Sequence, residues 1–318
     1  MVLSAIIVLV YAAYKLIVRP PAIPQPAAVS AVADVSLPED EPPPEGLARR
    51  DQVYTFLLVG VDNGNGNADT IMAACFDVPA RRVGIVSIPR DTIVDRAWSR
   101  YPKINGAYGK GGVALVREEV SRLLGIPIDY YVKIDLAGFV SLVDALGGVD
   151  FDVPADMNYD DPWQDLSIHF KKGVQHLDGK QAMQVARFRH NNDGSGYSDT
   201  GRTQTQQALL TALAKKMLSL SGMTKITELL SIVRENVTTD IPARDMTYFA
   251  TQALYVDPDT GVEGTTLSGR GDARYRGYTW CYELDRERTL EDINRLLNPY
   301  NKPVTEEMAH IVRADSYG

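Results

Sequence analysis

The sequence predicts a single layered α/β domain with a mixed central β-sheet flanked by helices, preceded by one N-terminal transmembrane helix. Short apolar runs rich in β-branched residues alternate with segments of helical spacing, which is typical of a layered α/β fold. The composition, with 45% apolar and 23% charged residues in a chain of 318, is that of a globular protein and excludes wholesale disorder. The opening stretch is almost wholly apolar, and a proline-rich segment follows it.

Residues 1–19 are interpreted as a membrane anchor. Met1–Val18 is apolar apart from Ser4 and Lys15, and a lysine near one end of a span of about 20 residues can reach the interface. The apolar region of a signal peptide and a buried core helix are the alternatives. Lys15 and Arg19 lie after the apolar run, which taken alone favours a cytoplasmic position for that side, so the residues leave the orientation open.

Residues 20–50 are interpreted as a Pro-rich acidic linker. Residues 20–45 hold eight of the 18 prolines, several alanines and five carboxylates, a composition that buries little. Such a stretch is extended and solvated. We take residues 51–220 as the core of the domain and residues 221–318 as the C-terminal part of the same domain.

The globular part begins with three short strands and continues with helices and strands in turn. The predicted strands are apolar and β-branched, at Val53–Val61, Thr70–Phe76, Arg82–Ile88, Tyr130–Asp135 and Val149–Val153. The predicted helices are Val113–Leu124, Gly138–Leu146, Gly179–Arg187, Thr203–Leu218, Thr224–Val233, Ala243–Tyr255 and Arg288–Leu297. The first has Val113, Val116, Val120 and Leu123 at helical spacing, and Gly147-Gly148 is a good stop for the second.

Charge and cysteine content exclude two classes of protein. The chain carries 33 Lys+Arg against 41 Asp+Glu, a net charge of −8, whereas a general nucleic-acid surface is basic. Two cysteines, Cys75 and Cys281, build neither a disulfide framework nor a thiolate zinc cage. Nothing in the sequence requires these two thiols to pair.

Two aspartates flank the Gly/Asn-rich loop after the first predicted strand. Asp62 ends that strand, and Asp69 opens the next one. If the two strands pair, both carboxylates lie at the mouth of one connection, where they repel unless one is protonated or a cation lies between them. Hard oxygen ligands of this kind suit Mg²⁺ together with substrate phosphates. The alternative is two ordinary turn aspartates.

The third predicted strand runs directly into Pro89, Arg90 and Asp91. Loops that leave strand ends are the usual place for sites in α/β folds. The alternative is a solvent-exposed ion pair of little energy. Lys103 and Asn105 follow in a segment that leads into a glycine-rich stretch, and they add a cation and a polar group.

Arg187 and Arg189 are the centre of the richest polar segment. Two residues apart, they diverge by about 200° on a helix but share a face of an extended chain, so a common site requires the helix to end there. Clustered arginines followed by a Gly-containing loop and a fresh helix suit a phosphate or pyrophosphate. Arg202 lies near the start of that helix, with Asp199 as a candidate N-cap and Gln206 further along. The alternative is a surface basic patch beside a solvated helix face.

Seven segments match one family pattern in the expected order. They are FLLVGVD (56–62), ADTIM (68–72), VGIVSIPRDT (83–92), KINGAY (103–108), IDYYVKIDLAGFVSLVDALGGVDFDVP (128–154), LDGKQAMQVARFRH (177–190) and DTGRTQTQQALLTAL (199–213). On these segments the chain resembles the LytR-CpsA-Psr (LCP) family of cell-wall ligases. The match spans roughly residues 53–220, and several segments in register are far more specific than any one of them.

The resemblance implies a mixed central sheet flanked by helices, with a groove for a polyprenyl lipid. It implies a phosphotransferase that moves a phosphate-linked glycopolymer, such as a teichoic acid or capsular polysaccharide, from a polyprenyl pyrophosphate carrier to peptidoglycan. The implied partners are the polyprenyl-pyrophosphate-linked glycan, the peptidoglycan acceptor and, through the N-terminal anchor, the membrane. Family members are typically single-span proteins facing the cell wall, which implies a cell-membrane protein with an extracytoplasmic catalytic domain.

The resemblance also implies roles for single residues. Asp62 and Asp69 match the family's Mg²⁺-associated aspartates, so Mg²⁺, or Mn²⁺ in its place, is the implied cofactor. The implied catalytic residues are four pyrophosphate-binding arginines and two aspartates that orient them or activate the attacking hydroxyl: Arg90, Arg187, Arg189, Arg202, Asp91 and Asp199. The implied substrate-binding residues are Lys103, Asn105 and Gln206.

Two positions depart from the family pattern. Asn67 and Thr205 stand where the family commonly has arginine, and each removes a positive charge from the implied anion site. Losing one guanidinium contact to phosphate costs on the order of a few kcal/mol. One alternative to the transferase is a pyrophosphatase that uses water as acceptor. Asn67 and Thr205 motivate another, a non-catalytic relative that binds lipid-linked glycan or regulates envelope assembly.

Overall fold

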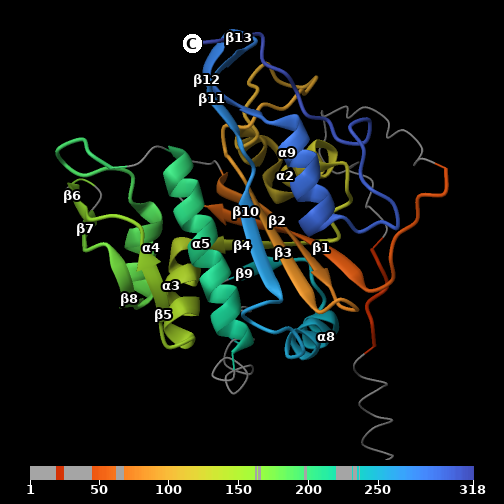
Figure 1. Ribbon diagram of the computed structural model, residues 1–318, viewed down its shortest axis with the longest axis horizontal. Helices are drawn as coiled ribbons and strands as arrows, with labels where there is room; N and C mark the ends of the chain where they lie inside the picture. The colour runs from red at the N-terminus through yellow and green to blue at the C-terminus, as the bar shows by residue number, and fades with distance from the viewer. Residues whose placement is uncertain are drawn as a thin grey trace, which may run out of the picture.

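The computed structural model describes residues 19–24, 45–61, 68–161, 163, 166–196, 199–219, 231, 235 and 237–318 (Figure 1). The proposed anchor up to residue 18, most of the linker, the predicted helix Thr224–Val233 apart from residue 231, and Asp62 and Asn67 lie outside these ranges. No helix within the described ranges is long and apolar enough to cross a membrane.

A six-stranded mixed sheet forms the centre of the molecule, in the order β10-β3-β2-β1-β4-β9. Three strands form an antiparallel meander: β1 (Val53–Val61), β2 (Ala68–Asp77) and β3 (Arg82–Ile88). β4 (Tyr130–Asp135) pairs with β1 in parallel, and β10 (Val262–Thr266) pairs with β3 in parallel. The short β9 (Val237–Thr239) closes the other edge. The prediction of a mixed central sheet is confirmed.

The alternation of side chains along β2 places a hydrophobic core on each face of the sheet. Ile71, Ala73 and Cys75 join the core on one face, with helix α2 (Gly106–Leu124) and the π-helix η1 (Ile293–Leu297). Met72, Ala74 and Phe76 join the core on the other, with helices α5 (Asp199–Leu218) and α8 (Ala243–Ala253). The sheet is therefore buried on both faces between layers of helices.

A second group of elements packs beside the sheet, on the left in Figure 1. Helices α3 (Leu136–Ala145) and α4 (Gly179–Arg187) pack against α5 around a core of their own. Two strand pairs complete this group: β5 (Val149–Val153) with β8 (Gly173–Leu177), and β6 (Met157–Asp161) with β7 (Leu166–Phe170). The group holds α4 so that its C-terminal end approaches α5.

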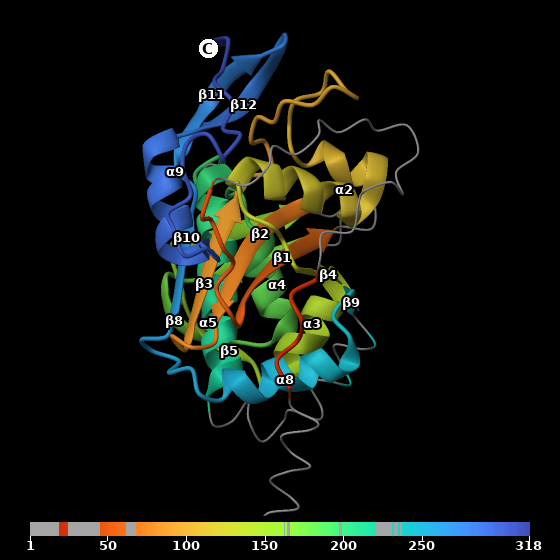
Figure 2. The ribbon, with the colours of Figure 1, turned by 90° about the vertical axis from the view of Figure 1, so that its right-hand side faces the viewer.

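The C-terminal residues add helix α9 (Arg286–Asp292), which leads into η1, and a small sheet of order β12-β11-β13. Its strands are β11 (Gly269–Tyr275), β12 (Tyr278–Leu284) and β13 (Ser316–Tyr317). Figure 2 shows the β11–β12 hairpin projecting past one end of the central sheet. Tyr282 on β12 exchanges backbone hydrogen bonds with Asp91 and Ile93, so this hairpin supports the loop that follows β3.

Several predicted boundaries were wrong at their ends. The helix predicted from Val113 begins at Gly106, with a kink at Gly111 and Gly112, because two glycines interrupt its hydrophobic spacing without ending it. The helix predicted as Thr203–Leu218 begins at Asp199, and the one predicted as Arg288–Leu297 is α9 followed by a π-helix. Strands β6 to β13 were not predicted.

Candidate active site

The candidate site lies at the end of the sheet where β1 ends, β2 begins and β3 ends. Val61 pairs with Ala68 and Gly60 with Thr70, so Asp69 is the extra residue at a register shift in the last part of this pairing. Ile88, at the end of β3, pairs with Ile71 and carries the chain into Pro89 and Arg90. Asp62 follows Val61 but lies outside the described residues. The strand pairing on which the carboxylate hypothesis depended is therefore present.

Four charged side chains form a chain of alternating sign at this end. Arg90 Nη1 lies 3.0 Å from Asp69 Oδ1, and Arg90 Nε lies 3.8 Å from Asp91 Oδ2. Lys103 Nζ lies 3.3 Å from the other oxygen of Asp91. The Arg90 and Asp91 side chains are both 25% exposed, which is open enough for a ligand and enclosed enough to weaken solvent screening.

The backbone around these side chains is firmly held. The Thr92 amide and hydroxyl both donate to the carbonyl of Pro89, at 3.0 and 2.6 Å. The Asn105 amide donates to the carbonyl of Arg90, at 3.1 Å, and the Tyr282 amide to that of Asp91, at 2.8 Å. The segments that carry Arg90 and Lys103 are thus tied to each other before any substrate binds, which is the pre-organisation that charge stabilisation requires.

Helix α4 ends between the two predicted arginines. Arg187 is its last residue, and Phe188 has φ −59° and ψ 136°, an extended conformation. The Phe188 side chain is fully buried, so it anchors the position where the chain leaves the helix. Arg187 is partly buried, and Arg189 is exposed. The chain therefore leaves its helix where a site shared by Arg187 and Arg189 requires it to.

Gln206 on α5 joins this arginine segment to the strand end. Its Oε1 accepts a hydrogen bond from the Thr70 hydroxyl at 3.2 Å, and its Nε2 donates to the Ala186 carbonyl at 2.9 Å. Thr70 is the neighbour of Asp69, and Ala186 is the neighbour of Arg187. The one glutamine side chain thereby fixes the spacing between the two halves of the site.

The remaining predicted residues lie on or beside the same helix. Arg202 is only 6% exposed and lies one turn before Gln206 on the same helix face. Asp199 is the first residue of α5, but its side chain lies outside the described part. Thr205 is buried, and its hydroxyl donates to the Gly201 carbonyl at 3.0 Å. The position that commonly holds arginine in the family is thus an inward-facing, uncharged one here.

The arrangement suits a phosphorylated ligand. Contacts tie four segments to one end of the sheet, and these segments bear five predicted cationic side chains: Arg90, Lys103, Arg187, Arg189 and Arg202. Asp69 presents carboxylate oxygens there, the donor type that Mg²⁺ takes alongside phosphate oxygens. Asp69 is thus of the donor type that such an ion takes, whereas Asp62, the second predicted ligand, lies outside the described residues.

Tyr101 was missed in the sequence and belongs beside the site. Its hydroxyl donates to Asn105 Oδ1 at 3.3 Å, and its ring meets that of Tyr278 edge to face, with centroids 5.5 Å apart. Burial raises the pKa of its hydroxyl, and the negative charge of Asp91 raises it further. Tyr101 precedes Lys103 by two residues, so its place next to the KIN segment was the only available signal.

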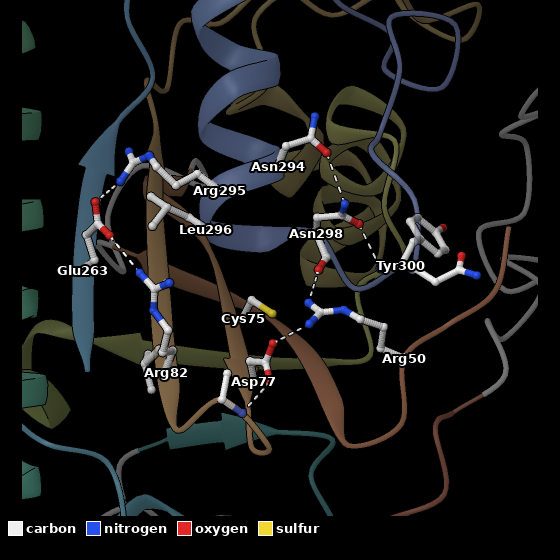
Figure 3. A pocket seen from close by; sticks show the side chains of 14 residues that line it. Arg50, Cys75, Asp77, Arg82, Glu263, Asn294, Arg295, Leu296, Asn298 and Tyr300 are labelled. Atoms are coloured by element: carbon white, nitrogen blue, oxygen red, sulfur yellow. Dashed lines mark hydrogen bonds and ion pairs between the residues drawn. The ribbon is translucent and has the colours of Figure 1, made fainter. Parts of the chain in front are cut away.

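A separate polar cavity of about 430 Å³ lies at the opposite end of β2 and β3 (Figure 3). Its arginines are already paired: Arg50 with Asp77 at 2.6 Å, and both Arg82 and Arg295 with Glu263. Cys75 also lines it, and burial raises the pKa of that thiol to about 12. Cys75 and Cys281 are both free. The cavity is a region of internal ion pairs, remote from the strand ends that carry the predicted residues.

Comparison with known proteins shows the family to which the sequence belongs. The sequence matches the LytR_cpsA_psr family profile over residues 30–297. A relative from Bacillus subtilis (strain 168), the polyisoprenyl-teichoic acid–peptidoglycan teichoic acid transferase TagV, is 34% identical over 257 residues. The aligned part covers 78% of this chain and 64% of TagV, so the chain spans less than two thirds of that relative's length.

Solved structures share the fold. The crystal structure of B. subtilis TagV gives a TM-score of 0.63 at 31% identity and covers 76% of this chain and 94% of that one. The structure described as TagT bound to LIIa-WTA gives a TM-score of 0.59 at 26% identity, covering 77% and 91%. The mixed sheet flanked by helices is therefore common to this chain and these proteins.

Proposed function

Because the chain belongs to the LytR_cpsA_psr family, we propose that it is a phosphotransferase of cell-wall assembly. It transfers a phosphate-linked glycopolymer, such as a teichoic acid or a capsular polysaccharide, from a polyprenyl pyrophosphate carrier to peptidoglycan. The observation that carries the proposal is the Asp69–Arg90–Asp91–Lys103 chain of contacts, linked through Gln206 to the arginine segment at Arg187.

The proposed reaction exchanges the phosphoanhydride bond of the pyrophosphate for a new phosphate ester bond to the acceptor. A peptidoglycan hydroxyl oxygen attacks the phosphorus that bears the glycan, the bond to the bridging pyrophosphate oxygen breaks, and polyprenyl phosphate leaves with the electron pair. The hydroxyl proton passes to a carboxylate, for which Asp199 at the start of α5 is our candidate. Most of the catalysis is positioning and charge neutralisation, since phosphoryl transfer demands little else of a protein.

The side chains divide this work. Arg187, Arg189 and Arg202 bind the pyrophosphate oxygens, and Arg90 with Lys103 stabilises the charge that develops on them. Asp91 contacts both Arg90 and Lys103, so its role is to orient the two cations. Asn105 and Gln206 are the further substrate-binding residues that we propose. Asp69 and Asp62 would hold Mg²⁺ or Mn²⁺, which supplies further neutralisation of the phosphates.

We further propose that the domain acts outside the cytoplasm at the cell membrane, held by the apolar segment at residues 1–19 and the linker at residues 20–50. Both the substrate's polyprenyl chain and the peptidoglycan acceptor are found there. Fractionation of cells that produce the full chain, with protease added outside, tests this placement. Protection of the globular part from the external protease would contradict it.

The decisive experiment is incubation of the full chain with a polyprenyl-pyrophosphate-linked glycan, Mg²⁺ and a peptidoglycan oligomer. A phosphodiester-linked product supports the transferase. Release of free phosphorylated glycan identifies a pyrophosphatase instead. Lipid binding without turnover identifies a non-catalytic binder and ends both enzymatic hypotheses. Removing the divalent ion with a chelator tests whether turnover depends on it. Unchanged turnover would show that the metal has no part in the mechanism.

Substitutions of the arginine segment test the site itself. Arg187→Ala and Arg189→Ala should each lower kcat by 10²-fold or more, because each removes a guanidinium that binds the reacting phosphates. Arg288→Ala on α9 is the matched control, since its side chain is 71% exposed and lies outside the site. Thermal unfolding of all three should match the parent. Activity within threefold of the parent in both site variants would show that the assignment is wrong.

A further inference from the structure

We infer that Arg96 and Glu119 form a buried positioning pair that holds Lys103 and the loop after β3 in their active geometry. This inference rests on the proposed function, because it assigns a role in that same site. Neither residue stands in a segment that matched the family pattern. Arg96 contacts the charged chain only through the backbone carbonyl of Lys103, so the pair acts by holding that backbone in place.

The pair is deeply buried beneath the site. The Arg96 and Glu119 side chains are 2% and 5% exposed, and Arg96 Nη2 lies 2.5 Å from Glu119 Oε2. The guanidinium also lies over the Trp98 ring, 4.6 Å from its centroid. Glu119 is on α2, the helix that starts directly after Asn105, whereas Arg96 is in the loop before Lys103. The pair therefore links the loop before Lys103 to helix α2, on either side of the segment that carries Lys103 and Asn105.

A direct contact leads from the pair to the site. The same Arg96 Nη2 donates to the Lys103 carbonyl at 3.1 Å. Two backbone hydrogen bonds flank this contact. The Val94 amide donates to the Pro102 carbonyl at 2.8 Å, and the Ile104 amide donates to the Thr92 carbonyl at 3.0 Å. Arg276, beside the β11–β12 turn, holds the Arg96 carbonyl at 3.1 Å. Lys103 is thus fixed from below by Arg96 while its amine reaches Asp91.

Stability alone is a poor reason for this pair. Arg96 Nε and Nη1 and Glu119 Oε1 are buried and find no hydrogen-bond partner within the described part of the chain. Replacing a buried ion pair by apolar side chains of similar volume is often neutral or stabilising, because desolvation offsets the attraction. What apolar side chains cannot supply is the hydrogen bond to the Lys103 carbonyl. A role in positioning accounts for both observations.

The double variant Arg96→Met/Glu119→Leu tests the inference. It removes both charges together, so no buried charge is left unpaired, and we expect a Tm equal to or above that of the parent. We expect kcat to fall about 100-fold with KM changed less than threefold, since small misplacement of catalytic groups has effects of that size. Arg117→Met is the control: Arg117 is on the same helix and pairs with Asp240 at 2.7 Å, away from the loop. A kcat within threefold of the parent in the double variant would overturn the inference.

Two further measurements keep the test decisive. In Arg96→Lys, the ammonium can still donate to both Glu119 and the Lys103 carbonyl. The kcat of this variant should therefore be at least tenfold higher than that of the single variant Arg96→Met. No rescue would count against positioning. If the parent chain shows no turnover, the proposed function fails and hydrogen exchange decides alone. Faster exchange of residues 92–106 in the double variant then supports the pair's role, and unchanged exchange overturns it.

Discussion

At the scale of single residues, the site depends on side chains that share partners. Asp91 contacts two cations, and Gln206 bridges two segments that are 116 positions apart in the chain, at Thr70 and Ala186. Such a group is expected to be strongly non-additive, because removing one member changes the geometry of the others. Substitutions in it should therefore be interpreted in pairs.

The buried carboxyl of Glu119 should give the fold a measurable pH dependence. Burial raises its pKa to about 7, although the attraction of Arg96 opposes the shift. The folded state thus holds a proton that the unfolded chain releases near its ordinary pKa of 4.5. Stability should fall as the pH rises from about 4.5 to about 7, by up to about 3 kcal/mol.

Urea unfolding of the parent and of Glu119→Gln at pH 5 and pH 7.5 measures this effect. Glutamine does not titrate, so the difference in unfolding free energy between the two proteins should shift by about 2–3 kcal/mol between the two pH values. Contributions from other titrating groups cancel in that comparison. An equal pH slope for both proteins would mean that Glu119 titrates normally.

At the scale of elements, α2 shows how a helix can be interrupted without being ended. Gly112 has φ 60° and ψ −153°, a conformation essentially restricted to glycine, and Gly111 before it is also non-helical. The kink separates the turn that follows Asn105 from the amphipathic stretch that packs on the sheet. Hydrophobic spacing indicated only the second part, which is why the predicted helix began at Val113.

Gly112→Ala should therefore cost about 1–3 kcal/mol from backbone strain alone. No atom lies within 4 Å of a Cβ built at this position, so crowding does not contribute. Gly271→Ala on β11 is the control, since a Cβ there meets only Tyr282 at 3.7 Å. Denaturant unfolding of both variants measures the difference. A loss below 0.5 kcal/mol in Gly112→Ala would show that the kink relaxes freely.

Strand β10 is an element that its sequence does not indicate. Val262–Thr266 contains a glutamate and a glycine, and a Cβ at Gly264 would lie 1.9 Å from the Gln207 side-chain amide, so a larger residue there would have to displace that side chain. The strand exists because the edge of β3 is available for pairing and α5 covers it. Its formation is decided by contacts with elements far away in the chain, which local propensity does not report.

At the scale of the whole molecule, the segment after residue 220 completes the sheet that carries the site. It supplies β9 and β10, the two edge strands, as well as η1 and α8, which cover opposite faces. β12 of the same segment holds the backbone of Asp91. The matched segments at residues 53–220 therefore lack part of their own sheet and part of the cover on each face.

A chain ending at residue 220 should fail to fold cooperatively. Loss of the segment after residue 220 would expose Met72, Phe76 and Ile85 on one face of the sheet. On the other face it would expose the surfaces packed against Ile293 and Leu297. A chain beginning at Arg19 is the control, since it keeps the Pro21 carbonyl that accepts a hydrogen bond from the Tyr54 hydroxyl. Circular dichroism and thermal unfolding compare the two. A cooperative transition in the truncated chain would show that residues 53–220 are self-sufficient.

The sequence by itself determined the mixed α/β class, the first three strands, the family and the segments in which the charged residues lie. These are local or periodic properties, because apolar strand segments, helix-ending glycines and motifs each depend on residues close together in the sequence. Only the tertiary structure decided that Gln206 joins Thr70 to Ala186, that Thr205 faces inward, and that Arg96 reaches Lys103 from beneath. Each of these depends on contacts between segments distant in sequence, where packing sets the geometry that local pattern leaves open.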